Sequence, residues 1–130
     1  MKFLPAPEIL QRVKFILPHV EMPYIKKEKL FCVKSWDSSS RAIARIYAFP
    51  RVFQIALDLK DPVYVIEVIS ERFDKLSKEN QDRVLIHELM HIPKTFSGSL
   101  VPHKCFGRKH ICDKTVEVLY QKFVMNPVYE

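Results

Sequence analysis

Two histidines and a glutamate interrupt an otherwise apolar run at residues 84–93, VLIHELMHIP. On a helix, residues four apart lie on the same face with Cβ atoms about 5–6 Å apart, so His87 and His91 would project together. Two imidazoles placed in this way can bind one metal ion at about 2.0–2.1 Å. Glu88 lies one step further round the helix, in a poor position for a third ligand but facing a water molecule on that metal.

The polar residues of this run also need partners, because a buried polar group without one costs about 1–3 kcal/mol. A zinc ion would satisfy the histidines and would lower the pKa of its bound water toward about 7. A carboxylate beside that water can take its proton, which gives Glu88 a role. The alternative is a helix whose histidines fall four apart by chance, and it leaves the three polar residues unexplained. The motif therefore predicts a catalytic zinc site with Glu88 as general base.

A catalytic zinc has three protein ligands and one open position, so a further ligand must follow the motif. The candidates are His103, His110 and Glu117. Glu117 lies among other charged residues and His110 follows two basic residues, so each has an ordinary surface interpretation. His103 follows a loop long enough to fold back over the helix end. We expect His103 to be the third ligand and keep His110 and Glu117 as alternatives.

Two cysteines, Cys105 and Cys112, lie close to these candidates in the sequence. Two thiolates and two histidines would close the coordination shell and make the site structural rather than catalytic. The cysteines lack the tight spacing of such sites, and a structural site gives Glu88 no role. Three cysteines, an odd number in a small chain, fit reduced thiols better than a disulfide framework.

Apolar spacing and turn residues predict the elements that must position the motif. We expect helices at residues 7–17, 78–92 and 111–124, strands at 30–36, 41–49, 52–59 and 64–69, and a loop at 94–109. Ser77 is the expected N-cap of the motif helix. A helix, a block of short strands and then further helices predict an α+β fold, and we expect one domain over residues 1–130.

The composition of the 130-residue chain, 48% hydrophobic and 28% charged, is that of a globular protein and argues against disorder. No apolar run approaches the roughly 18–20 residues of a membrane span, so we expect no membrane partner. Glu8 and Arg12 interrupt the first apolar segment, which argues against a signal peptide and for a cytoplasmic location. The net charge of +6 is scattered along the chain and supports nucleic-acid binding only weakly.

Residues 64–103, YVIEVISERFDKLSKENQDRVLIHELMHIPKTFSGSLVPH, resemble the zincin metallopeptidases. They are most similar to small single-domain metallopeptidases of archaea and phages that are related to SprT-like proteins. In SprT-like proteins the motif helix is followed by a loop, a third histidine and an aromatic residue, and His103 with Phe106 matches that pattern. The resemblance implies a zincin-like fold, in which a small mixed sheet packs against the motif helix with helices toward each terminus.

The same resemblance implies a zinc-dependent peptidase that acts on a peptide or protein substrate. The edge strand of the sheet would line the cleft and hold an extended peptide through main-chain hydrogen bonds. Hydrolysis of a peptide bond passes through a tetrahedral intermediate that carries an oxyanion. Apart from the resemblance, Tyr120 and His110 are candidates for stabilising that oxyanion. The alternative is a zincin fold that binds zinc without catalysis, as a protein or nucleic-acid interaction module; some SprT-like proteases act on DNA-bound proteins. An intact Glu88 favours the enzyme.

Overall fold

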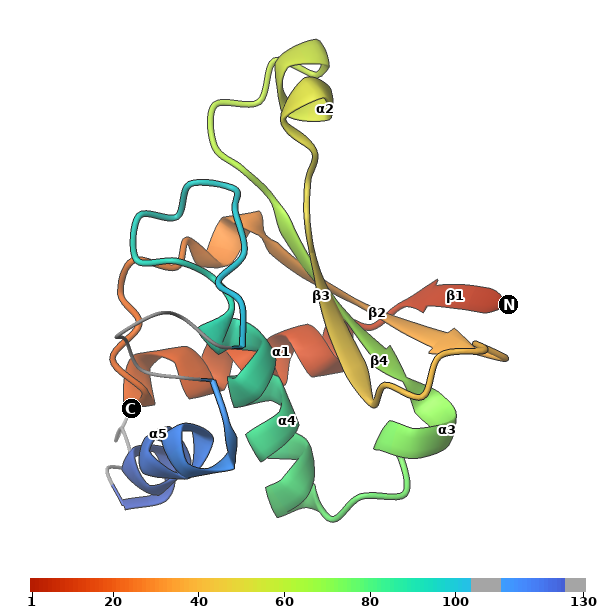
Figure 1. The fold of residues 1–130 in the computed structure, drawn as a ribbon, viewed down its shortest axis with the longest axis vertical. Helices are drawn as coiled ribbons and strands as arrows, with labels where there is room; N and C mark the ends of the chain where they lie inside the picture. Colours follow the sequence, from red (N-terminus) through yellow and green to blue (C-terminus); the bar gives the residue numbers. More distant parts are fainter. Residues whose placement is uncertain (104–110, 126–130) are drawn as a thin grey trace.

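A computed structural model describes residues 1–103 and 111–125 as a mixed α+β fold around a four-stranded sheet (Figure 1). The strands are β1 (Lys2–Pro5), β2 (Leu30–Trp36), β3 (Ala44–Ala48) and β4 (Tyr64–Ile69). Their order in the sheet is β1-β2-β4-β3. The central strands β2 and β4 run parallel, and each outer strand pairs antiparallel with its neighbour. The sheet is therefore mixed, as expected, and β3 is one of its edges.

Five α-helices accompany the sheet within the described residues: α1 (Pro7–Ile16), α2 (Arg51–Ala56), α3 (Ser70–Phe73), α4 (Lys78–Met90) and α5 (Asp113–Met125). Two short 3-10 helices, η1 (Leu17–His19) and η2 (Lys27–Lys29), follow α1. The predicted helices at both ends of the chain, the motif helix and three of the four predicted strands are confirmed, with small shifts in their bounds. No helix in residues 1–103 or 111–125 has the length and apolar character to cross a bilayer.

The core lies between one face of the sheet and helices α1 and α4. Its fully buried members include Val13, Tyr64, Ile66, Val68, Leu85, Ile86 and Leu89. Burial of such side chains contributes about 1.5–3 kcal/mol each. Arg12 of α1 donates to Asp82 of α4 at 2.6 Å and ties the two helices together. One stripe of α4 is thus committed to the core, which leaves its opposite face for the site.

The strand predicted at residues 52–59 is wrong, because the segment begins within α2, which ends at Ala56, and continues as a turn. Phe53, Ile55 and Leu57 alternate as in a strand, yet their side chains are exposed by 52%, 66% and 60%. A strand needs a neighbour for its backbone groups and a core for its buried face. The segment lies at the tip of the β3–β4 connection, beyond the sheet (Figure 1), so local helical hydrogen bonds satisfy its backbone. β1 and α3 were not predicted.

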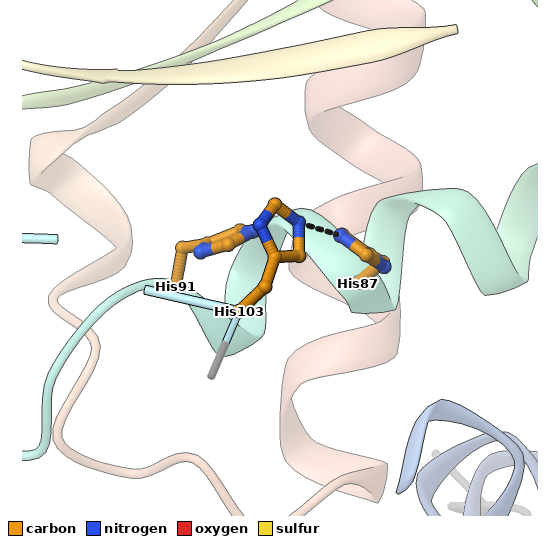
Figure 2. Close-up of side chains that lie close together, drawn as sticks. All are labelled: His87, His91 and His103. Atoms are coloured by element: carbon orange, nitrogen blue, oxygen red, sulfur yellow. Dashed lines mark hydrogen bonds between the residues drawn. The ribbon is translucent and has the colours of Figure 1, made fainter. Parts of the chain in front are cut away.

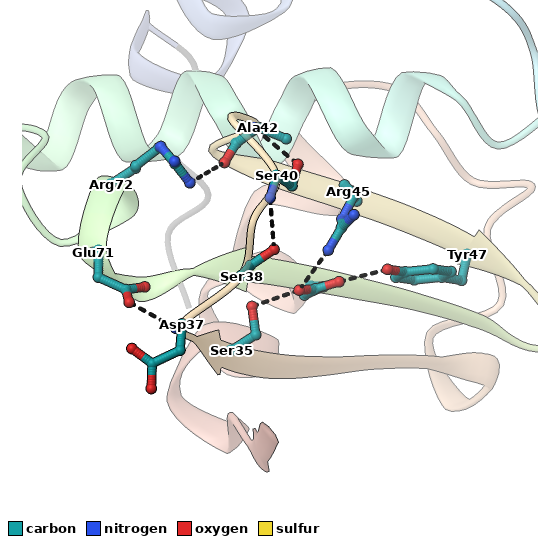
Figure 3. Close-up of polar contacts among 10 residues, drawn as sticks. Ser35, Asp37, Ser38, Ser40, Ala42, Arg45, Tyr47, Glu71 and Arg72 are labelled. Carbon is teal, nitrogen blue, oxygen red and sulfur yellow. Dashed lines mark hydrogen bonds and ion pairs between the residues drawn. The ribbon is translucent and has the colours of Figure 1, made fainter. Parts of the chain in front are cut away.

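A buried acid, Glu67 of β4, fastens the edge strand β3 to the sheet on the face away from the core. Its carboxylate accepts from Ser35 Oγ at 2.5 Å, Tyr47 OH at 2.6 Å and Arg45 Nη2 at 3.2 Å. These three labelled side chains converge in Figure 3. Glu67 itself has no exposed surface. Burial acts to raise the pKa of Glu67, but the three hydrogen bonds outweigh it and lower that pKa overall.

We expect Glu67→Gln to lower the free energy of unfolding at pH 7 by about 1–3 kcal/mol, because hydrogen bonds to the charged carboxylate are lost. The folded-state pKa of Glu67 lies below its unfolded value of about 4.3. The stabilisation is therefore present above that unfolded value and is lost as the pH falls through the folded one. Urea unfolding at pH 7 and at about pH 3 should show the difference between parent and variant shrinking with acid.

The matched control is Glu28→Gln, which changes an exposed glutamate. It should leave the free energy of unfolding within about 0.5 kcal/mol of the parent at both pH values. A Glu67→Gln penalty that stays constant down to about pH 3 would contradict an ionised carboxylate in this network.

Candidate metal centre

Helix α4 carries the motif and presents a continuous stripe of side chains to a cleft. The stripe consists of Asn80, Arg83, Val84, His87, Glu88 and His91. These positions recur every three or four residues, which places them on one face of the helix. Ser77 caps the helix as predicted, since its Oγ accepts a hydrogen bond from the backbone N–H of Asn80 at 3.2 Å. The helix ends at Met90, with His91 at its C-cap.

Three histidines converge at the C-terminal end of α4 (Figure 2). His87, His91 and His103 each offer a nitrogen, and these atoms lie within 4.8 Å of one another. His87 Nε2 and His103 Nε2 are 3.0 Å apart. In a tetrahedral site with bonds of 2.0–2.1 Å, ligand nitrogens lie about 3.3 Å apart. Among the described residues this is the one group of side chains that could hold a metal ion, and its donor set suits zinc.

The loop after α4 is fastened to the helix end by Val101. Its backbone N–H donates to the carbonyl of His91 at 2.7 Å, and its carbonyl accepts from His91 Nδ1 at 2.5 Å. The first bond satisfies a carbonyl that the helix end leaves free. The second makes Nδ1 the protonated nitrogen of His91 and leaves Nε2 available to a metal. Val101 thus orients one histidine and also places His103, two residues further on.

Further anchors hold this loop at both ends. The buried Tyr64 of β4 donates its OH to the Ser99 carbonyl at 2.9 Å and accepts from the Gly98 N–H at 2.8 Å. Gly98 has φ +93°, and a Cβ there would lie 3.2 Å from Pro62, so glycine suits this turn on both counts. On the other side, the carbonyl of His103 accepts from the N–H of Ile111 at 3.0 Å. The sequence motif gave no indication that Val101 and Tyr64 would hold the loop after α4.

Burial shifts the pKa values of His87 and Glu88. Burial and the neighbouring histidines lower the pKa of His87, so its imidazole stays neutral and able to bind a metal. Glu88 is only 7% exposed, and burial raises its pKa to about 7. Its Oε2 lies 4.0 Å from His87 Nε2. Glu88 therefore lies beside the histidine group without belonging to it.

The alternatives to His103 are placed elsewhere or lie outside the described residues. Glu117 forms a two-pronged ion pair with Arg83, with contacts of 2.9 and 3.3 Å, and does not join the histidines. His110 and Cys105 fall in 104–110 and lie outside the described residues, as does the aromatic Phe106. Cys112 is exposed and is not part of the histidine group. Tyr120, considered for the oxyanion, is buried beneath Arg83 and does not line the cleft.

The cleft above the histidines has a volume of about 950 Å³, and β3 forms one of its walls. β3 pairs only with β4 among the described strands, so its other edge is free. The carbonyl of Ile43 accepts from the N–H of Ile69, and the N–H of Phe49 donates to the carbonyl of Val63, both at 2.9 Å. Backbone groups alternate in direction along an antiparallel strand. Ala44, Ile46 and Ala48 therefore direct their N–H and C=O groups toward the free edge.

The fold and the site together define a mixed α+β protein with a three-histidine group, able to hold a metal ion, beside a buried glutamate. The chain matches the model of the family described as "Putative phage metallopeptidase" over residues 1–116. It belongs to this family, and the match includes α4 and all three histidines. No match was found among curated proteins or among solved structures.

Proposed function

We propose that this protein is a zinc-dependent peptidase on a single zincin-like domain, with His87, His91 and His103 as the metal ligands and Glu88 as the general base. The observation that carries the proposal is the convergence of three histidines beside a buried carboxylate, in a cleft with a free strand edge. Family membership supports a peptidase that uses a metal ion. Three imidazoles and one open position suit catalytic zinc.

The chain's own residues supply positioning and proton transfer. The free backbone groups of Ala44, Ile46 and Ala48 can hold an extended peptide as an added strand. The zinc ion, when bound, would activate a water molecule and polarise the scissile carbonyl. Glu88 accepts the proton of the attacking water and delivers it to the leaving amine. With its pKa near 7, Glu88 can both take and return that proton at neutral pH.

Removal of the metal is the direct test. We expect the purified protein to contain one zinc ion per chain and to cleave labelled casein or members of a peptide library. Dialysis against a chelator should abolish cleavage, and added Zn²⁺ should restore it, because the metal activates the water. Elemental analysis and a gel-based cleavage assay provide the measurements. A protein that contains no metal, or that cleaves equally well after chelation, would refute the proposal.

A further inference from the structure

The helix α2 exposes an apolar surface that neither the core nor the candidate metal centre uses. Val52, Phe53, Ile55 and Leu57 are exposed by 66%, 52%, 66% and 60%, and we call them the apolar tip. Monomeric proteins seldom leave several large apolar side chains together in water unless they contact a partner. Val52 and Ile55, three positions apart, lie on the same face of this short helix.

The apolar tip follows β3 directly in the chain, and the part of β3 that lines the cleft ends at Tyr47. β3 lines the cleft and ends at Ala48, and α2 begins at Arg51. Phe49, between them, contacts the ring of Phe53 at a centroid distance of 5.8 Å, so apolar surface continues from the strand onto the helix. Figure 1 shows α2 standing out from the rest of the molecule at the end of β3. A peptide extended along β3 advances about 3.3 Å per residue and would reach α2 within about three residues after Ala48.

The charges around the tip argue against a membrane as its partner. Between residues 51 and 61, Arg51 and Lys60 oppose Asp58 and Asp61, which gives a local net charge of zero. Helices that bind a membrane surface carry an excess of lysine and arginine that attracts anionic lipids. The segment 51–61 carries no such excess of its own, and the neighbouring Lys26 is paired with Asp61 at 2.6 Å.

The size of the tip argues against a second copy of the chain. A stable interface between two proteins buries about 800 Å² on each side and involves about 20–30 residues. The four exposed apolar residues of the apolar tip are far fewer than the residues of such an interface. A segment already held along β3 needs only a small additional contact, because its local concentration at the tip is high.

From these observations we propose that the apolar tip is a docking site for an apolar stretch of the polypeptide substrate, a few residues beyond the part that lies along β3. The proposal rests on the proposed function, since it takes β3 as the wall that holds the substrate. If the proposal is correct, the enzyme prefers unfolded chains that carry apolar residues several positions away from the cleaved bond. Folded proteins bury such stretches and would not present them.

The test uses fluorescein-labelled β-casein as the unfolded, apolar-rich chain and measures its binding by fluorescence anisotropy. Binding is measured with the full-length, zinc-loaded Glu88→Gln protein, so that cleavage does not interfere. Adding Val52→Ser and Ile55→Ser should weaken binding by about tenfold or more, because two apolar contacts are lost. The matched control, Val118→Ser with Met125→Ser, changes two side chains on α5 that are also exposed, by 57% and 73%, and should bind as the parent does.

Several results would overturn the docking site. The tip variant could bind β-casein as tightly as the Glu88→Gln protein does. The control could weaken binding as much as the tip variant does. The Glu88→Gln protein itself could fail to bind β-casein. Sedimentation velocity that shows a dimer in the parent and a monomer in the tip variant would assign the tip to a second copy. Tip-dependent pelleting with phosphatidylcholine–phosphatidylserine vesicles would assign it to a membrane. If the Glu88-containing protein fails to cleave β-casein while binding still depends on the tip, the peptidase proposal fails and the docking site stands.

Discussion

Replacing Glu88 with glutamine is expected to reduce peptide hydrolysis by about 10²–10⁴-fold, the usual contribution of a general base. Glutamine keeps the size and much of the hydrogen bonding of glutamate, but it cannot take a proton from water. Because Glu88 lies beside the histidine group and is not one of its members, the variant should keep its zinc and its fold. Cleavage of labelled casein, elemental analysis and a thermal melt measure the three properties.

Asn80→Ala is the control for Glu88→Gln, because Asn80 lines the same face of α4 away from the histidines. It should lower hydrolysis far less than Glu88→Gln does. A Glu88→Gln protein that cleaves as fast as the parent would refute the assigned base. If the parent and the Glu88→Gln variant both hold zinc and neither cleaves any substrate, the alternative of a non-catalytic zinc-binding module gains support.

Replacing His103 with alanine is expected to weaken zinc binding by more than about 100-fold. Loss of a residue that merely orients a ligand typically costs 10–100-fold in metal affinity, and loss of a ligand should cost more. His103 Nε2 lies 3.0 Å from His87 Nε2, so it is placed to share a metal with that residue. Competition with a chromophoric chelator measures the affinity directly, without any need for a substrate.

The two alternative ligands provide the controls for His103→Ala. His110→Ala and Glu117→Gln should both bind zinc as the parent does, the latter because Glu117 is paired with Arg83. Loss of zinc in His110→Ala together with retention in His103→Ala would transfer the role to His110. Retention in both histidine variants would point to Glu117.

The local features of the site could be predicted from the sequence because they depend on residues close together in the chain. The helical spacing of His87 and His91 places them on one face, and Ser77 caps the helix through the N–H of Asn80. β-branched residues likewise indicated β4, whose bounds are those predicted. Such features arise from backbone geometry and short-range hydrogen bonds, which a few neighbouring residues determine.

Glu67 was a missed signal of another kind. It stands in the middle of YVIEVI, a run of buried strand residues, where an acid cannot stay without partners. An acid at this position in the sequence could have predicted a buried network of hydrogen bonds around it. The partners themselves, Ser35, Arg45 and Tyr47, come from two other strands, and only the order and register of the sheet bring them to Glu67.

What the sequence determined by itself was the pair of histidines on one helical face, the adjacent Glu88 and the α+β order of elements. Only the tertiary structure brought His103 to that pair, through the bonds of Val101 to the helix end, and engaged Glu117 with Arg83. The helical conformation of residues 51–56 was likewise decided by the tertiary structure, because the segment projects beyond the sheet and no described strand pairs with it. Contacts between distant residues depend on how the elements pack, and short-range patterns do not contain that information.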